Sequence, residues 1–131
     1  CYIINISINS ALYKNITIAQ GKNIEIDLNG HELYGQFEKL IDNCGDLIIS
    51  DSSEAKSGAI RSTGNYVISD RNGSNVTVNG GTITTTLSSP IYHLARLGNI
   101  TVNGGSIVGK GYCGIYTISQ GNVVINGGSI T

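Results

Sequence analysis

The side chains of this 131-residue chain that could do acid–base chemistry are nine carboxylates and two histidines. General acid–base catalysis needs two or three such groups facing one point. Two pairings come from neighbouring segments, Asp27 with Asp51 and Asp42 with Asp70. Asp51 falls in a short inserted loop, and the other two acids are expected only to share a face. We therefore predict no catalytic residues and a protein that is not an enzyme.

The basic and imidazole groups add little to these pairs. Arg71 and Arg96 fall near the second pair along the chain. His31 follows an Asn-Gly turn where later repeats carry Gly, which predicts an exposed or turn-capping side chain. His93 alternates along its segment with residues expected to face inward, so we expect it on the outer surface.

Metal and cofactor sites have no support in the sequence. Cys1, Cys44 and Cys113 show no Cys-x-x-Cys spacing and no nearby pair of histidines, and an odd number argues against a disulfide framework. We expect Cys44 and Cys113 to pack as small apolar residues. The repeats also lack the Asp of the Gly-Gly-x-Gly-x-Asp motif that binds Ca²⁺ in other solenoids. The chain is predicted to bind neither a metal nor a cofactor.

Three tyrosines recur at a nearly constant interval. Tyr66, Tyr92 and Tyr116 are separated by 26 and 24 residues. At such spacing they would stack in one column if each belonged to a successive turn of a solenoid. We interpret the column chiefly as packing, because stacked rings add about 0.5–1.5 kcal/mol per pair beyond burial. If the column is exposed, it would contact glycans.

The element that must position these groups is a short strand followed by Asn-Gly-Gly. It occurs as NVTVNGG from Asn75, NITVNGG from Asn99 and NVVINGG from Asn122, at periods of 24 and 23 residues. A weaker copy runs from Ile26 to Leu33, and another at Leu47 carries a small inserted loop over residues 51–57. A period of this size with alternating β-branched residues indicates a β-solenoid.

Each repeat contains two further short strands, one before and one after this unit. Three strands per coil predict an all-β, right-handed parallel β-helix, with about five coils of roughly 21–29 residues in one domain over residues 1–131. Because coils stack at about 4.8 Å, five of them give a rod of roughly 24 Å. Such a domain is expected to be a segment of a longer solenoid or a subunit that stacks on its own copies.

The turn residues are predicted to form a structural ladder. We expect Asn29, Asn79, Asn103 and Asn126 to occupy equivalent turns, because Asn tolerates left-handed φ values and amides can bond along a stack. The glycines that follow the last three, Gly80, Gly104 and Gly127, let the chain turn tightly.

Composition excludes two classes of partner. Only 13% of residues are charged and the net charge is -1, so there is no clustered basic face for nucleic acid. No apolar run approaches the roughly 18 residues of a membrane span, and no membrane insertion is expected.

The chain resembles the pectin-lyase-like β-helix segments of large secreted and cell-surface bacterial proteins. The resemblance rests on NIEIDLNGHELYG from Asn23 to Gly35, IDNCGDLIISDSS from Ile41 to Ser53, and Gly-Ala-Ile at residues 58–60. It implies the β-helix fold and an extracellular or bacterial cell-surface location. Enzymes of this family act on acidic polysaccharides, but the Asn-x-Asp, Asp-Asp and Gly-His-Gly motifs of its hydrolases are not found in this sequence.

These observations together predict a non-enzymatic structural or adhesive solenoid, which acts as a stiff rod or display surface. One alternative is an extracellular fibre subunit that stacks end to end, since its strand edges are mostly neutral. Another is a module that binds or cleaves polysaccharide. The expected partners are copies of the chain itself and host or cell-wall glycans, the latter through Tyr66, Tyr92 and Tyr116.

Overall fold

The computed structural model describes residues 1–94, 97–118 and 120–131, and within these ranges the chain forms strands and turns without a helix. The strands fall into three parallel sheets, here named A, B and C. Sheet A contains β1 (Tyr2–Asn5), β4 (Asn23–Asp27), β7 (Asp46–Ser50), β10 (Asn75–Val78), β13 (Ile100–Val102) and β16 (Val123–Ile125). Sheet B contains β2 (Ser10–Ala11), β5 (Glu32–Gly35), β8 (Ala59–Ser62), β11 (Thr82–Thr85), β14 (Ser106–Gly109) and β17 (Ser129–Ile130). Sheet C contains β3 (Ile16–Ile18), β6 (Lys39–Asn43), β9 (Tyr66–Asp70), β12 (Ile91–His93) and β15 (Ile115–Thr117).

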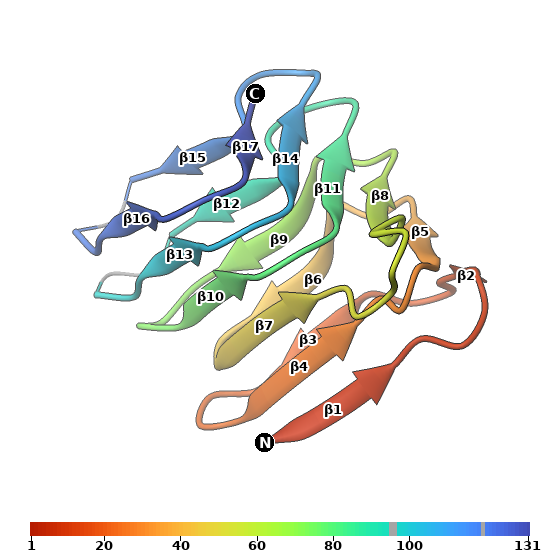
Figure 1. Ribbon diagram of the computed structural model, residues 1–131. Helices are drawn as coiled ribbons and strands as arrows, with labels where there is room; N and C mark the ends of the chain where they lie inside the picture. Colours follow the sequence, from red (N-terminus) through yellow and green to blue (C-terminus); the bar gives the residue numbers. More distant parts are fainter. Residues whose placement is uncertain (95–96, 119) are drawn as a thin grey trace.

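The chain visits the three sheets in the same order on every turn. Coil 1 consists of β1 to β3, coil 2 of β4 to β6, coil 3 of β7 to β9, coil 4 of β10 to β12 and coil 5 of β13 to β15, and β16 and β17 begin another turn. In Figure 1 the coils stack from the red N-terminal end to the blue C-terminal end, with the three sheets as three faces. The prediction of an all-β parallel β-helix of about five coils is confirmed.

Strand register explains the alternating pattern of the repeats. In sheet A, Ile26 pairs with Ile49, Ile49 with Val78, and Val78 with Val102, and all four side chains are buried. In sheet B, Leu33, Ile60, Ile83 and Ile107 form an equivalent buried column. Burying one such side chain contributes about 1.5–3 kcal/mol, so the interior columns supply the main stabilisation of the rod.

The second glycine of each Asn-Gly-Gly turn is required by both conformation and space. Gly81, Gly105 and Gly128 have φ values of 86°, 81° and 77°. A Cβ atom on Gly105 would lie 2.5 Å from the Gly81 carbonyl oxygen, and one on Gly128 would lie 2.6 Å from that of Gly105. A side chain at these positions would therefore push the stacked turns apart.

Coil 2 differs from the alignment expected from sequence. The register places Ile24 opposite Leu47, in the column of Val76 and Ile100, whereas the sequence comparison gave that position to Ile26. The turn between β4 and β5 is therefore two residues longer than the Asn-Gly-Gly turns of later coils. As a result, Asp27 occupies the position that Asn fills farther along the rod.

Candidate functional site

The predicted asparagine ladder is placed along the corner between sheets A and B. Asn103 Nδ2 donates to Asn79 Oδ1 at 2.9 Å, and Asn126 Nδ2 donates to Asn103 Oδ1 at 2.8 Å. All three side chains are exposed to solvent. A Cβ atom on Gly104 would lie 2.6 Å from the Asn79 carbonyl oxygen, so the close stacking of these turns needs glycine there.

The other turn glycines are not all equally crowded. A Cβ on Gly127 would lie 2.6 Å from the Asn103 carbonyl oxygen, whereas one on Gly80 would lie 3.3 Å from the backbone nitrogen of Asp51. The tightest packing thus belongs to the turns that stack on an identical turn.

Asn29 lies outside the ladder. It has a φ of 48°, its backbone N–H donates to Asp27 Oδ1 at 3.0 Å, and its Nδ2 donates to the Ile6 carbonyl oxygen at 3.4 Å. The reason is the longer turn of coil 2, which puts Asp27 at the ladder position. Asn29 supports its own turn and does not join the stack of amides.

A second asparagine ladder, which the sequence analysis missed, runs along the start of the sheet A strands. Asn75 Nδ2 donates to Asp46 Oδ1 at 2.8 Å. The backbone N–H of Asn99 donates to Asn75 Oδ1 at 2.9 Å, and that of Asn122 to Asn99 Oδ1 at 3.1 Å. The sequence contained the signal for this second ladder, because each clear repeat carries one Asn at the start of its strand and another just after it.

The three tyrosines of the sequence prediction lie together on the outer face of sheet C. The ring centroids of Tyr66 and Tyr92 are 4.5 Å apart with planes at 22°, and those of Tyr92 and Tyr116 are 5.3 Å apart with planes at 6°. All three side chains are half-buried. They form a stacked column over coils 3 to 5.

The strands that carry these tyrosines pair less regularly than the stacked rings suggest. Tyr92 pairs in register with Tyr116, but its partner on the other side is Ser69. The backbone N–H groups of Val67 and Ile68 both donate to the Pro90 carbonyl oxygen, at 2.9 and 2.8 Å. Tyr66 therefore reaches the column from a position that the strand register alone does not predict.

A fourth tyrosine, which the sequence analysis did not single out, completes this surface. Tyr112 lies in the turn before β15, with its ring centroid 5.7 Å from that of Tyr116 and the planes at 43°. With Ser88 and the three stacked tyrosines it lines an open hollow of about 250 Å³, here called the tyrosine hollow. No strand repeat marked Tyr112, because it lies in a turn.

Stacking limits what the column can do chemically. Both faces of the Tyr92 ring are covered by its neighbours, so the column offers ring edges and phenol hydroxyls to a ligand. A phenol hydroxyl both donates and accepts hydrogen bonds. The stacked column therefore presents hydrogen-bonding groups and no flat aromatic face at Tyr92.

A second hollow of about 280 Å³ adjoins the first and shares two tyrosines with it. It is lined by Glu38, Lys39, Tyr66, Ser69, Arg71, Tyr92 and Leu94 and is here called the charged hollow. Arg71 Nε and Nη2 donate to the two Asp42 carboxylate oxygens at 3.1 and 2.8 Å, and Lys39 Nζ lies 3.5 Å from Asp42 Oδ2. Asp42 is thus held in ion pairs. Arg96, which the sequence placed nearby, lies outside the described residues.

His93 is not on the surface, and this part of the sequence prediction was wrong. Asn43, Asp70 and His93 occupy equivalent positions on β6, β9 and β12, and all three side chains are buried. Asp70 Oδ2 lies 2.5 Å from His93 Nδ1, and Asn43 Nδ2 donates to Asp70 Oδ1 at 3.3 Å. Asp70 also accepts a hydrogen bond from the Ser74 hydroxyl. Hence Asp42 and Asp70 do not share a face, since they point to opposite sides of sheet C.

The hydrogen bonds fix one proton of this buried pair, and burial shifts the pKa values of both side chains. His93 Nε2 lies 3.0 Å from the Gly98 carbonyl oxygen, which can only accept, so Nε2 carries a hydrogen. Burial raises the pKa of Asp70 to about 8, and the Asp46 charge acts in the same direction. Burial also lowers the pKa of His93. At neutral pH the pair is therefore a protonated Asp70 donating to a neutral His93.

Asp27 and Asp51 serve the backbone of the inserted loop. Asp51 accepts from the backbone N–H groups of Gly30 at 2.9 Å and Gly58 at 2.6 Å, and from the Ser53 hydroxyl at 2.7 Å. Burial raises the pKa of the Asp51 carboxyl, but these hydrogen bonds outweigh it and hold the pKa below its ordinary value. The pKa of Asp27 is lowered in the same way, with Ser52 as donor. Both acids hold turns together.

The remaining candidates have structural surroundings. His31 is half-buried in the turn after β4, where its backbone N–H donates to the Leu28 carbonyl oxygen at 2.8 Å. Cys44 and Cys113 are free and half-buried. They have polar neighbours and do not belong to the apolar core, since Cys44 Sγ lies 3.8 Å from Asn72 Nδ2 and Cys113 Sγ donates to the Ile115 carbonyl oxygen at 3.4 Å.

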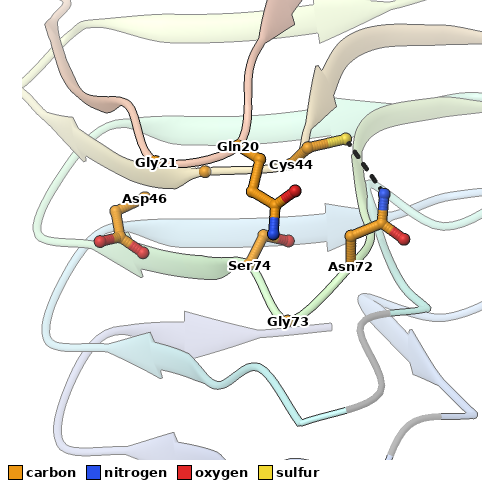
Figure 2. Close-up of a pocket in the computed structure, with 8 residues that line it drawn as sticks. Gln20, Gly21, Cys44, Asp46, Asn72, Gly73 and Ser74 are labelled. Atoms are coloured by element: carbon orange, nitrogen blue, oxygen red, sulfur yellow. Dashed lines mark hydrogen bonds between the residues drawn. The ribbon is translucent and has the colours of Figure 1, made fainter.

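Cys44 also lines a polar hollow of about 120 Å³ at the corner between sheets C and A. Figure 2 shows Gln20, Asp46 and Asn72 around it, with the contact between Cys44 and Asn72 dashed. Ser74 also lines this hollow, and its hydroxyl donates to the buried Asp70. The hollow collects one carboxylate and amides, which is too few strong ligands to define a metal site.

The described residues contain neither a cluster of metal ligands nor a membrane-spanning helix. Within residues 1–94, 97–118 and 120–131, no group of three or more His, Cys, Asp or Glu side chains could hold a metal ion. The same part of the chain has no helix with the length and apolarity to cross a membrane.

Comparisons with known proteins add no family to these observations. No protein-family model matches the chain, and neither a curated protein nor a solved structure shows significant similarity to it.

Proposed function

We propose that this chain is a non-enzymatic structural and adhesive β-solenoid of an extracellular bacterial surface protein. It acts as a stiff rod and displays the tyrosine column of Tyr66, Tyr92 and Tyr116 to host or cell-wall glycans. The observation that carries the proposal is that the two sides of sheet C present different kinds of side chain. Its inner side is tied up in buried columns, whereas its outer side collects tyrosines in an open hollow.

Three of the carboxyl groups are held in hydrogen bonds or ion pairs within the fold, which supports a role other than catalysis. Asp70 is buried against His93, Asp42 is paired with Arg71 and Lys39, and Asp51 accepts backbone hydrogen bonds. A glycoside hydrolase needs two carboxyl groups flanking a substrate-sized gap. Groups that already hold the fold together cannot be spared for that chemistry without destabilising it.

The test is to incubate the protein with a panel of neutral and acidic polysaccharides and to record both binding and cleavage. Affinity electrophoresis is expected to show retardation in at least one gel, and chromatography of the soluble fraction is expected to show no new oligosaccharides. A Tyr92→Ser variant should move faster in the retarding gel than the wild type. Release of oligosaccharides would contradict the non-enzymatic role, and the absence of any retardation would contradict the adhesive one.

A second candidate, an end-to-end fibre, is favoured by a separate observation. The apolar columns repeat from coil to coil, as Val78 over Val102 in sheet A and Ile83 over Ile107 in sheet B, so a coil of a second copy could add in the same register. Electron microscopy across a range of protein concentrations decides the matter, because filaments with an axial repeat near five coils would support the fibre and isolated particles would exclude it.

A further inference from the structure

The tyrosine hollow has an uncharged lining. Its walls are Tyr66, Tyr92, Tyr112, Tyr116 and Ser88, which contribute no carboxylate, ammonium or guanidinium group. A charged group placed there would lose water without meeting an opposite charge, which is costly. An uncharged ligand with many hydroxyls loses less, because phenol and serine hydroxyls replace its water.

Tyr112 differs from the other three tyrosines in what it offers. The Tyr92 ring is covered on both faces by the stack, whereas the side chain of Tyr112 is 70% exposed. Its plane is tilted by 43° from that of Tyr116, so it stands apart from the column. Tyr112 is thus the most exposed ring of this cluster and offers the most apolar surface to a ligand.

The size of the hollow restricts the length of the ligand. Sites for drug-sized molecules occupy about 300–1,000 Å³, and this hollow, at about 250 Å³, is smaller. It has room for one sugar ring. A longer chain would have to continue into the charged hollow, where Glu38, Lys39 and Arg71 would surround the next ring.

We infer that the tyrosine hollow binds a single uncharged pyranose ring at the end of a glycan. The Tyr112 ring packs against the apolar C–H face of the sugar, and the hydroxyls of Tyr66, Tyr92 and Tyr116 exchange hydrogen bonds with the sugar hydroxyls. This inference rests on the proposed glycan-contact function and makes it specific, because it names the residue that selects the ligand and the charge of the ring that is bound. Tyrosine suits such a role because it presents a large rigid surface with little entropy to lose.

The experiment titrates the full chain with methyl glycosides and follows binding by NMR. The probes are the methyl glycosides of glucose, galactose, mannose and N-acetylglucosamine, and that of glucuronic acid serves as the charged counterpart. At least one neutral probe is expected to bind, more tightly than the glucuronide. Tyr112→Ala should weaken binding about tenfold, a typical loss for an aromatic anchor.

Three variants make the result specific. Tyr112→Phe keeps the ring and should bind within about twofold of the wild type, as truncation of a ring and not loss of its hydroxyl removes the contact. Tyr92→Phe keeps the stack but loses a hydroxyl, and it should bind more weakly than the wild type. Tyr13→Ala is the control, because Tyr13 is fully exposed before β3 and far from the hollow in the chain, and it should have no effect.

The outcomes separate this inference from the proposed function. If the glucuronide binds best, or if Tyr112→Ala binds as the wild type does, the hollow does not hold a neutral ring, although glycan contact through the charged hollow stands. If no glycoside binds while a polysaccharide gel still retards the protein, the single-ring site is excluded and the adhesive role survives. If neither glycosides nor polysaccharides bind, both are overturned.

Discussion

Sheets A and C share one architecture but differ in how strictly they repeat. Sheet A presents nearly the same strand in β10, β13 and β16, with Val and Ile at the inward positions and an amide ladder at each end of these strands. Sheet C is also built of parallel strands, yet its inward column changes from Asn43 to Asp70 to His93. Its outer face gathers the tyrosines.

This difference suggests separate roles for the two sheets. The repeated residues of sheet A hold the coils together, whereas the unlike residues of sheet C make individual coils distinct. A column of identical residues can be extended by one coil without any new partner. A column of different residues works only when each neighbour has the complementary group, as the carboxyl of Asp70 has for His93. The irregular sheet is therefore where we expect substitutions to have large and specific effects.

The largest effect is expected from removal of the buried carboxyl. Asp70→Ala leaves His93, Asn43 and Ser74 without their common partner, and each buried polar group left unsatisfied costs about 1–3 kcal/mol. Urea unfolding measures the loss. Asp70→Asn is the matched variant, because an amide donates and accepts as a protonated carboxyl does, and it should cost less than about 1 kcal/mol.

In sheet A the corresponding control is Ile49→Val, which should cost about 0.5–1.5 kcal/mol. If Asp70→Asn proved as harmful as Asp70→Ala, the pair would be ionised, and the contrast between a neutral polar column and an apolar one would fail.

The next effect tests the stacked turns between sheets A and B. Gly105→Ala forces a side chain into a φ of 81° and brings its Cβ to 2.5 Å from the Gly81 carbonyl oxygen. We expect a loss of about 2–3 kcal/mol, from strain and from displacement of the neighbouring turn. Gly73→Ala isolates the strain, because Gly73 has a φ of 72° but nothing within 4 Å of a Cβ, and thermal unfolding should show a smaller loss. Equal losses would mean that close stacking is unimportant.

The pH dependence of stability probes sheet C alone. The ordinary pKa values are 3.8 for Asp70 and 6.5 for His93. Between pH 3.8 and 6.5 the folded pair holds one proton, on Asp70, and the unfolded chain also holds one, on His93. Stability should therefore not change across this range. From pH 6.5 to about 8 the folded pair keeps a proton that the unfolded chain has released. Stability should thus fall by roughly 2 kcal/mol across this window.

Urea midpoints measured from pH 5 to pH 9 test this directly. Asp70→Asn cannot lose that proton, so its curve should stay level between pH 6.5 and 8. A wild-type curve that is also level would show that the folded pair releases this proton at the same pH as the unfolded chain, so that Asp70 is not protonated above pH 6.5.

The smallest effect is expected from the amide ladder. Asn103→Ala removes hydrogen bonds to Asn79 and Asn126, but all three side chains are exposed and water can replace the bonds. We expect about 0.5–1 kcal/mol, less than a buried amide would give. Chemical denaturation measures it, with Gln36→Ala as control because Gln36 is an exposed amide outside both ladders. If the denaturation midpoint of Asn103→Ala equals that of the control, the ladder does not stabilise the protein.

The sequence predicts the fold because the signal is repeated. Asn-Gly-Gly turns and alternating Val and Ile recur at a nearly constant period, and each copy supports the same register. The same logic fails in coil 2, where a longer turn moved Asn29 out of the ladder. A difference of two residues in turn length is invisible when strand sequences are aligned by their turn residues.

The sequence predicts individual side chains less well where they occur once. His93 looks like a surface residue by alternation, and only the register with Asp70 reveals a buried partner. Tyr112 lies in a turn, so no periodic pattern marks it, and its contact with Tyr116 depends on the path of that turn. Local patterns identify columns, whereas contacts between unlike residues need the three-dimensional register.

The hydrogen bonds of the two ladders all point the same way along the rod. Asn126 donates to Asn103, Asn103 to Asn79, and the backbone of Asn122 to Asn99, in each case from the later coil to the earlier one. The rod therefore has a direction: the amide acceptors face its C-terminal end, here called forward, and the donors face its N-terminal end. Two such rods that met forward end to forward end would oppose acceptor to acceptor. Any axial assembly that continues the ladders must be head-to-tail, and a two-fold symmetric one is disfavoured.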